Sequence, residues 1–236
     1  MQELKSQYPV LAQAKAHTHI DAEKYDAMYK QSIEQPDVFW AEQAEEFLDW
    51  YKPWDSVSDV DLQSAKINWF TGGKLNVSYN CIDRHLATKA NDTAIIWEGD
   101  DPSEDKNITY QELHDHVCRF ANLLKARGVK KGDRVCIYMP MIPEIGYAML
   151  ACARIGAVHS VVFGGFSTEA IRSRIIDADC KVVITSDESL RGGRVIPLKV
   201  NVDAAIAECP SVHSVIVVER TGGDVAWNDK VDIKYQ

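Results

Sequence analysis

The stretch VVFGGFSTEAI, residues 161–171, holds the pattern that decides the fold of this chain. A run of β-branched residues stops at Gly164-Gly165, and Ser167 follows directly as a typical N-cap of a helix. A buried strand that leads at once into a helix is the repeating unit of a parallel α/β sheet. A plain turn needs fewer glycines, so the pattern also indicates a loop whose backbone approaches a ligand or another segment closely.

The same alternation of strand and helix recurs from residue 93 onward. Apolar runs, each followed by enough chain for a helical crossover, predict strands that start near residues 94, 134, 159, 181 and 214. These runs are continuously apolar, as in strands that are covered on both faces. The sequence therefore predicts a doubly wound, mainly parallel α/β sheet over residues 91–236.

The helix that follows the first predicted strand has well-marked ends. Thr109 and Glu112 form a capping box at its start, and Gly128 supplies a stop at its end. Its apolar residues recur on one face at helical spacing: Leu113, Val117, Phe120 and Leu124. We expect this face to pack on the sheet.

Residues 1–90 are rich in aromatic side chains and carry no such alternation. Several of these side chains recur near helical spacing, namely Phe39, Trp40, Phe47, Trp50 and Tyr51. Stripes of this kind pack in a core more often than they line a ligand site. We therefore expect an N-terminal helical, aromatic-rich extension over residues 1–90, followed by the α/β part over residues 91–236.

The composition is that of an ordinary globular protein of 236 residues, with a formal net charge of −9. This charge argues against nucleic acid and anionic membranes as partners, because both attract basic surfaces. The sequence contains neither a membrane-length apolar run nor the apolar core of a signal peptide. Its six cysteines are scattered without a C-x-x-C pair, so we expect buried, reduced thiols in a cytoplasmic protein.

Two unusual loops follow strands of the predicted sheet, at the ends where open parallel sheets bind their ligands. One loop runs from Phe163 to Phe166, and the other covers residues 186–199. Strands that are consecutive in the chain are often neighbours, so we expect the two loops to lie close together. The glycine amides of the first loop, with the helix start at Ser167, can point at an anion. The alternative is a tight turn whose phenylalanines belong to the core.

The second loop carries three basic residues and no acidic residue between positions 189 and 199: Arg191, Arg194 and Lys199. Arginine suits phosphate because its guanidinium offers a planar fork of donors. We expect Gly192 and Gly193 to keep the loop slender and flexible, with Ile196 as an apolar surface beside it. The alternative is a solvated basic surface, but the two loops together favour a phosphate- or nucleotide-binding site.

Motifs of other nucleotide-dependent or hydrolytic enzymes are absent from the sequence. The stretch WFTGGKLN, residues 69–76, lacks the first glycine and the Ser or Thr that a P-loop requires. Neither G-x-G-x-x-G nor G-x-S-x-G occurs. The acidic stretch EGDDPSEDKN, residues 98–107, favours a solvated surface loop over a metal site.

Several long blocks of the sequence match a known family nearly verbatim. They include GDRVCIYMPMIPEIGYAMLACARIGAVHSVVFGGFS, residues 132–167, and RGGRVIPLKVNVDAAI, residues 191–206. With these blocks the sequence resembles the N-terminal part of the acetyl-coenzyme A synthetases, the AMP-forming acetate–CoA ligases of the adenylate-forming superfamily. The similarity runs from about residue 37 to about residue 227.

The resemblance implies a partial large domain of the adenylate-forming fold. It also implies a ligase that joins acetate to ATP, with Mg²⁺ assisting, and then passes the acetyl group from acetyl-adenylate to CoA. In this family the two loops hold the nucleotide end of CoA. Carried over by position, Arg191 and Arg194 would contact CoA phosphates, while the adenine would be bordered by Phe163, Gly164, Gly165 and Ile196.

The sequence lacks the family's YTSGSTGxPKG-type phosphate loop and the lysine of its C-terminal domain. We therefore assign no catalytic residue and no Mg²⁺ ligand here, and we expect the chain to be inactive alone and to need the remainder of the synthetase. The alternative is a free-standing CoA- or nucleotide-binding module without catalysis, which micromolar CoA binding by the isolated chain would support. Propionate is the nearest alternative to acetate as the substrate.

Overall fold

The computed structural model describes residues 9–235 of the chain. Packing divides the chain into two compact units, residues 1–75 and residues 76–236. No helix in the described part is long and apolar enough to span a bilayer.

The first unit consists of helices followed by a β-hairpin. The helices are α1 (Ala12–His17), α2 (Ala22–Glu34) and α3 (Pro36–Phe47). The hairpin pairs β1 (Ser56–Asp61) antiparallel with β2 (Lys66–Thr71). The sequence pattern missed this hairpin because its strands contain Asp, Lys and Asn, which are depleted in strands.

The aromatic side chains of the first unit cluster where the hairpin meets the chain that precedes it. The ring centroids of Trp50, Trp54 and Phe70 lie 5.0–5.5 Å apart. The Trp50 indole also donates a hydrogen bond to the carbonyl oxygen of Ala44 at 3.0 Å. Phe70 has a left-handed φ of 49°, a strained conformation for an aromatic residue that this packing holds in place.

The aromatic residues that recur near helical spacing do not all lie on one helix. Helix α3 ends at Phe47, so the residues from Trp50 onward lie outside it. Within the stripe, Phe39 is buried, whereas Trp40 and Tyr51 are exposed. Packing in the core, which we expected for the stripe, therefore holds for Phe39 but not for Trp40 or Tyr51.

The second unit is built on a parallel sheet of five strands with the order β11-β10-β7-β5-β6. The strands are β5 (Arg134–Met139), β6 (Val158–Phe163), β7 (Val182–Ser186), β10 (Ser214–Val218) and β11 (Asp232–Lys234). Four helices accompany them: α5 (Tyr110–Ala126), α6 (Pro143–Ile155), α7 (Thr168–Ala178) and α8 (Leu198–Ile206).

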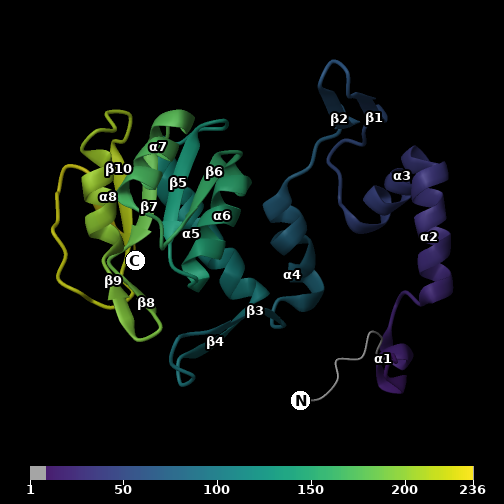
Figure 1. Ribbon diagram of the computed structural model, residues 1–236, viewed down its shortest axis with the longest axis horizontal. Coiled ribbons are helices and arrows are strands. Elements are labelled where there is room, and N and C mark those ends of the chain that lie inside the picture. The colour runs from purple at the N-terminus through teal and green to yellow at the C-terminus, as the bar shows by residue number, and fades with distance from the viewer. Residues whose placement is uncertain (1–8, 236) are drawn as a thin grey trace, which may run out of the picture. The chain divides into compact units, whose positions relative to one another are not determined.

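Helices cover both faces of this sheet, as Figure 1 shows. Successive side chains of a strand point to opposite faces. Val135 and Ile137 of β5 accordingly join one core with α5 and α6. Cys136 and Tyr138 of the same strand join a second core with α7 and α8. The predicted doubly wound, mainly parallel α/β sheet is confirmed.

The signals predicted for α5 are present in the structure. The Thr109 hydroxyl accepts the Glu112 amide at 3.2 Å, and the Glu112 carboxylate accepts the Thr109 amide at 2.8 Å. The predicted inner face of the helix is buried, at Leu113, Val117, Phe120 and Leu124. Local rules of capping and spacing were sufficient here because the whole pattern lies within one element.

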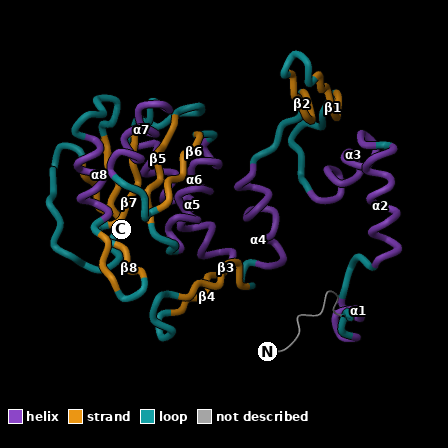
Figure 2. Tube along the Cα trace, viewed as in Figure 1, coloured by secondary structure: helices purple, strands orange, loops and turns teal. Residues whose placement is uncertain are grey.

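The strand predicted near residue 94 does not belong to the parallel sheet. In Figure 2, β3 (Thr93–Glu98) lies with β4 (Asp105–Thr109), and the two pair antiparallel in a hairpin of their own. The fifth parallel strand is β11 instead. An apolar run such as that of β3 fits either place, and the polar residues of β4 concealed its partner strand from the sequence pattern.

A π-helical turn, η1 (Tyr79–Asp83), and helix α4 (Arg84–Lys89) open the second unit. Arg154 on α6 ties this segment down, because its guanidinium donates to both carboxylate oxygens of Asp83, at 2.8 and 2.6 Å. The same guanidinium also donates to the Ser78 hydroxyl at 3.1 Å.

Four of the six cysteines are buried, namely Cys136, Cys152, Cys180 and Cys209, whereas Cys81 is exposed. Burial raises the pKa of Cys136 and Cys152 to about 12 and the pKa of Cys180 to about 11. These buried groups are therefore neutral thiols near pH 7, and only the thiolate is a good nucleophile.

We expect iodoacetamide at about pH 7 to modify Cys81 first and to leave the buried cysteines unmodified until urea unfolds the chain. Burial blocks access to these thiols and also keeps them protonated. Mass spectrometry of the alkylated peptides measures the order of labelling. Rapid labelling of Cys136 in the native chain would contradict the described core.

Candidate functional site

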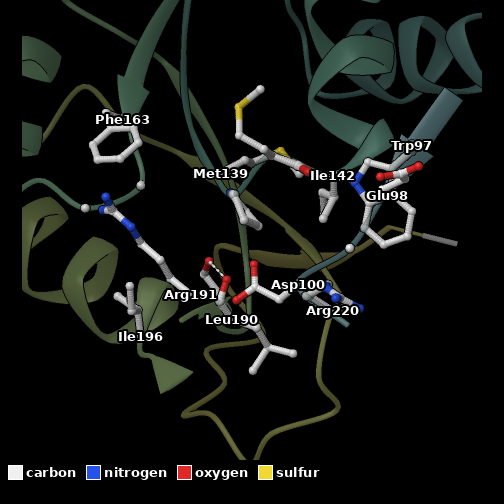
Figure 3. A pocket seen from close by; sticks show the side chains of 16 residues that line it. Trp97, Glu98, Asp100, Met139, Ile142, Phe163, Leu190, Arg191, Ile196 and Arg220 are labelled. Atoms are coloured by element: carbon white, nitrogen blue, oxygen red, sulfur yellow. Dashed lines mark hydrogen bonds between the residues drawn. The ribbon is translucent and has the colours of Figure 1, made fainter. Parts of the chain in front are cut away.

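The two loops that the sequence singled out meet at one cavity, although their strands are not neighbours. β5 lies between β6 and β7 in the sheet, so the expected adjacency of the strands is wrong. The loops meet because β7 leads into a small hairpin of β8 (Ser189–Arg191) and β9 (Arg194–Ile196), whose residues line the same cavity as the glycine loop. Figure 3 shows this arrangement, with Phe163 and Arg191 side by side.

The cavity has a volume of about 280 Å³. Its walls come from segments that are far apart in the sequence: the β3–β4 hairpin, the end of β5 with the loop that follows, the glycine loop, the β8–β9 hairpin, and a loop after β10. The lining residues are 97–100, 139–142, 163–165, 189–191, Ile196 and Arg220. The cavity therefore lies at the carboxyl ends of the parallel strands, where ligands of open α/β sheets bind.

The glycines of the first loop are needed for close packing rather than for an unusual φ. Neither Gly164 nor Gly165 has a left-handed φ. A Cβ at Gly164 would lie 3.0 Å from the carbonyl oxygen of Met139. A Cβ at Gly165 would lie 2.8 Å from the Phe163 ring and 3.2 Å from Nη1 of Arg191. Any larger residue would therefore push the loop away from β5 or displace the guanidinium.

A buried tyrosine holds the glycine loop from below. The Tyr138 hydroxyl lies 2.9 Å from the carbonyl oxygen of Phe166 and 3.3 Å from that of Gly164, and it donates to them. Asn201 on α8 donates to the same hydroxyl at 3.4 Å. Burial raises the pKa of Tyr138, so the phenol remains a donor at neutral pH. The Tyr138 side chain thus connects β5, the glycine loop (Phe163 to Phe166) and α8, the helix that follows the arginine hairpin of β8 and β9.

The arginine hairpin is a tight turn rather than the flexible loop we expected. Gly192 and Gly193 both have left-handed φ values, 56° and 73°, as a two-residue type I′ turn requires. Arg191 and Arg194 are directly opposite each other across the hairpin. Like charges in such a position destabilise a strand pair. Within residues 9–235, neither guanidinium forms an ion pair with a carboxylate.

The structure brings five of the six predicted site residues to the cavity, namely Phe163, Gly164, Gly165, Arg191 and Ile196. The Arg191 guanidinium lies over the Phe163 ring, 5.2 Å from its centroid, and Phe163 as a residue is 51% exposed. Arg194 is exposed at the outer end of the turn and does not line the cavity.

Lys199 does not belong to the basic surface that the sequence suggested. It points inward from α8 and is 1% exposed. Its ammonium forms ion pairs with Asp203 at 2.6 Å and with Asp232 at 2.9 Å. Helical spacing places this position on the inner face of α8, so the side chain serves the attachment of the helix and not a ligand.

Sequence reasoning missed the side of the cavity that the β3–β4 hairpin supplies. The Trp97 indole donates to the carbonyl oxygen of Met141 at 2.8 Å, and the Arg220 guanidinium lies 5.4 Å from the centre of the indole. Arg220 is also paired with Glu104. The acidic loop predicted to be merely solvated is therefore part of the cavity wall. A lone tryptophan in a polar hairpin was the only sequence signal for it.

A buried carboxylate holds the loop that carries Arg220. Oδ1 of Asp187 accepts the Arg220 amide at 2.8 Å and the Glu188 amide at 2.7 Å. Oδ2 accepts the Gly222 amide at 2.8 Å. Burial by itself would raise the pKa of Asp187, but these amide hydrogen bonds together outweigh burial and lower it.

We expect Asp187→Asn to lower the free energy of unfolding by about 1–3 kcal/mol, because an amide group faces the same N–H donors with one acceptor fewer. Since the folded pKa of Asp187 is lowered, its stabilisation is present above the unfolded pKa of about 3.9 and is lost as the pH falls through the folded pKa. The difference between wild type and variant should thus be constant from about pH 5 to 7 and shrink below about pH 4. Urea denaturation at several pH values measures it, and a difference that grows in acid would contradict this account.

The sequence of the chain matches two known protein families. A family model described as "AMP-binding enzyme" matches residues 82–234, which is more than half of the chain. The chain belongs to the AMP-binding enzyme family. A second model, described as "Acetyl-coenzyme A synthetase N-terminus", matches residues 25–81. Together the two models confirm the resemblance that the long sequence blocks indicated.

Curated relatives of this AMP-binding family member are described as acetyl-coenzyme A synthetases. The acetyl-coenzyme A synthetase of Saccharophagus degradans is 69% identical over 226 residues, which cover 96% of this chain and 35% of that protein. Acetyl-coenzyme A synthetase 2 of Pseudomonas putida is 62% identical over 228 residues, which cover 97% of this chain and 35% of that protein. The chain thus spans about a third of the length of the curated relatives it matches.

A solved structure shares the fold of this family member. The acetoacetyl-CoA synthetase from Streptomyces lividans superposes with a TM-score of 0.79 at 27% sequence identity. The match covers 94% of this chain and 34% of that chain. The expected partial adenylate-forming fold is confirmed.

Proposed function

We propose that this chain supplies the CoA nucleotide subsite of an acetate–CoA ligase that makes acetyl-CoA from acetate, ATP and CoA through acetyl-adenylate. The observation that carries the proposal is that Arg191 and Arg194 are opposite each other in the hairpin, and that neither guanidinium has a carboxylate partner within residues 9–235. An anion at this turn would relieve the repulsion between them. Phosphate is the anion that the planar fork of arginine matches best.

The surroundings of the turn suit a phosphorylated adenosine. Phe163 is half-exposed although Arg191 lies over its ring, and it lines the cavity with Ile196, so the two supply apolar surface for a flat base. The volume of about 280 Å³ is at the lower end of ligand pockets, so it suits the nucleotide end of CoA rather than the entire molecule. The basic turn also stands out in a chain with a net charge of −9.

The adenylation step is not assigned to residues of this chain. ATP and Mg²⁺ would be substrate and cofactor of the whole ligase, and within residues 9–235 no cluster of His, Cys, Asp or Glu could hold the ion. We propose that the remainder of a synthetase supplies these groups, that acetate is the acyl substrate, and that the enzyme works in the cytoplasm.

We expect the isolated chain to catalyse no acetate-dependent exchange between ATP and pyrophosphate, because the preorganised charges that such a transfer needs are not among its assigned residues. Incorporation of labelled pyrophosphate into ATP measures the reaction. Exchange by the pure chain above a blank without acetate would contradict the proposed division of labour.

A chimera tests the proposed subsite under turnover. In it, this chain replaces the matching N-terminal part of the Saccharophagus degradans synthetase, with which it is 69% identical. We expect Arg191→Ala to raise the KM for CoA about tenfold or more, since a lost charge-assisted hydrogen bond costs about 1.5–3 kcal/mol. The KM values for acetate and ATP should change little.

Arg174→Ala is the matched control for the chimera, because its guanidinium lies over the Phe166 ring of the same loop and outside the cavity. This variant should leave the KM for CoA near that of the parent chimera. An equal loss for all three substrates in Arg191→Ala would indicate general misfolding and contradict the assignment.

A further inference from the structure

One contact in the cavity joins the β3–β4 hairpin, which we call the acidic hairpin, to the arginine hairpin formed by β8 and β9. Oδ2 of Asp100 accepts the amide of Gly192 at 2.7 Å, across 92 positions of the sequence. Asp100 lines the cavity, and Figure 3 shows its carboxylate between Leu190 and Arg220. The carboxylate thus occupies the one turn whose flanking residues are both unpaired arginines within residues 9–235.

The fold of the acidic hairpin does not depend on the charge of Asp100. The neighbouring Asp101 closes the turn of this hairpin, because its Oδ1 accepts the Ser103 amide at 2.9 Å and the Ser103 hydroxyl at 2.8 Å. The Glu104 amide adds a bond to the carbonyl oxygen of Asp101 at 2.9 Å. Asp100 therefore contacts the arginine hairpin and does not close its own turn. A neutral acceptor at this position could accept the Gly192 amide equally well.

A carboxylate at this place has an electrostatic consequence for any ligand. The Gly192 amide lies in the turn between Arg191 and Arg194, whose positive charges attract an anion to this turn. In the free chain the anion at the amide is Asp100 itself. A phosphate that approaches the same donors meets the repulsion of that carboxylate, and it gains the Gly192 amide only when Asp100 leaves.

We propose that Asp100 is an affinity-determining residue of this site, whose carboxylate holds the anion position of the arginine turn until a nucleotide phosphate displaces it. The inference rests on the proposed nucleotide subsite and adds a built-in competitor to it. Asp100 lowers the affinity for phosphorylated ligands and leaves the affinity for unphosphorylated adenosine unchanged. It also keeps the turn attached to the β3–β4 hairpin while the site is empty.

The test uses the whole 236-residue chain and two variants of equal charge, Asp100→Asn and Asp101→Asn. Each variant removes one negative charge from the same hairpin, but only the first removes it from the arginine turn. The chain is titrated with adenosine 3′,5′-bisphosphate and with adenosine, and the amide NMR signals of Gly192 and Gly193 report binding. Inorganic pyrophosphate is a third probe without a base.

We expect Asp100→Asn to bind the bisphosphate about two- to fivefold more tightly than the wild type, the range that an exposed charge pair supplies. Asp101→Asn should bind it like the wild type, and adenosine should not distinguish the variants. Asp100→Ala should gain affinity as well, because it also removes the competing charge. A bisphosphate affinity of Asp100→Asn equal to or below that of Asp101→Asn overturns the inference.

The outcomes separate this inference from the nucleotide assignment. In one outcome the bisphosphate binds the wild type, Arg191→Ala abolishes this binding, and Asp100→Asn does not strengthen it. This result would support the nucleotide subsite and contradict the role of Asp100 as a competitor. If the bisphosphate does not bind the wild type, the nucleotide assignment falls. In that case, the titration with pyrophosphate tests whether Asp100 competes with a bound anion. A larger shift of the Gly192 signal in Asp100→Asn than in Asp101→Asn supports the competitor, and equal shifts overturn it.

Discussion

The contact of the Arg191 guanidinium with the Phe163 ring, 5.2 Å from its centroid, is the interaction on which the candidate site depends. It joins segments that follow β6 and β7, which are separated in the sheet by β5. The absence of a side chain at position 165 favours this contact, since a Cβ there would lie 2.8 Å from the Phe163 ring and 3.2 Å from the guanidinium. The left-handed φ values of Gly192 and Gly193 also contribute, because they form the tight turn that follows Arg191.

Behind this contact, hydrogen bonds from buried side chains hold the loops that line the cavity. The Tyr138 hydroxyl fixes the glycine loop to the sheet, and Asn201 links that hydroxyl to α8. On the far side, Asp187 gathers the amides that position Arg220. The basic turn itself is held by the Asp100 carboxylate, which accepts the Gly192 amide, and not by an ion pair to either guanidinium within residues 9–235. The anion that would pair with the two guanidinium groups is the group we assign to the ligand.

Much of the fold could be predicted from the sequence because its signals are local. The capping box at Thr109, the inner face of α5 and the continuous apolar strands each lie within one element, and the structure confirms them. Strand order could not be predicted in this way, so β3 was placed in the wrong sheet. The same reason hid Asp100, whose partner is 92 positions away, and it gave Lys199 the wrong surroundings. Residue type predicts chemistry, whereas burial and partners follow from tertiary packing.

The most direct test of the central claim is a crystal structure of the chain with adenosine 3′,5′-bisphosphate. We predict the base against the Phe163 ring and Ile196, with a phosphate held by the guanidinium groups of Arg191 and Arg194. A nucleotide bound elsewhere, with no anion at the turn, would contradict the account.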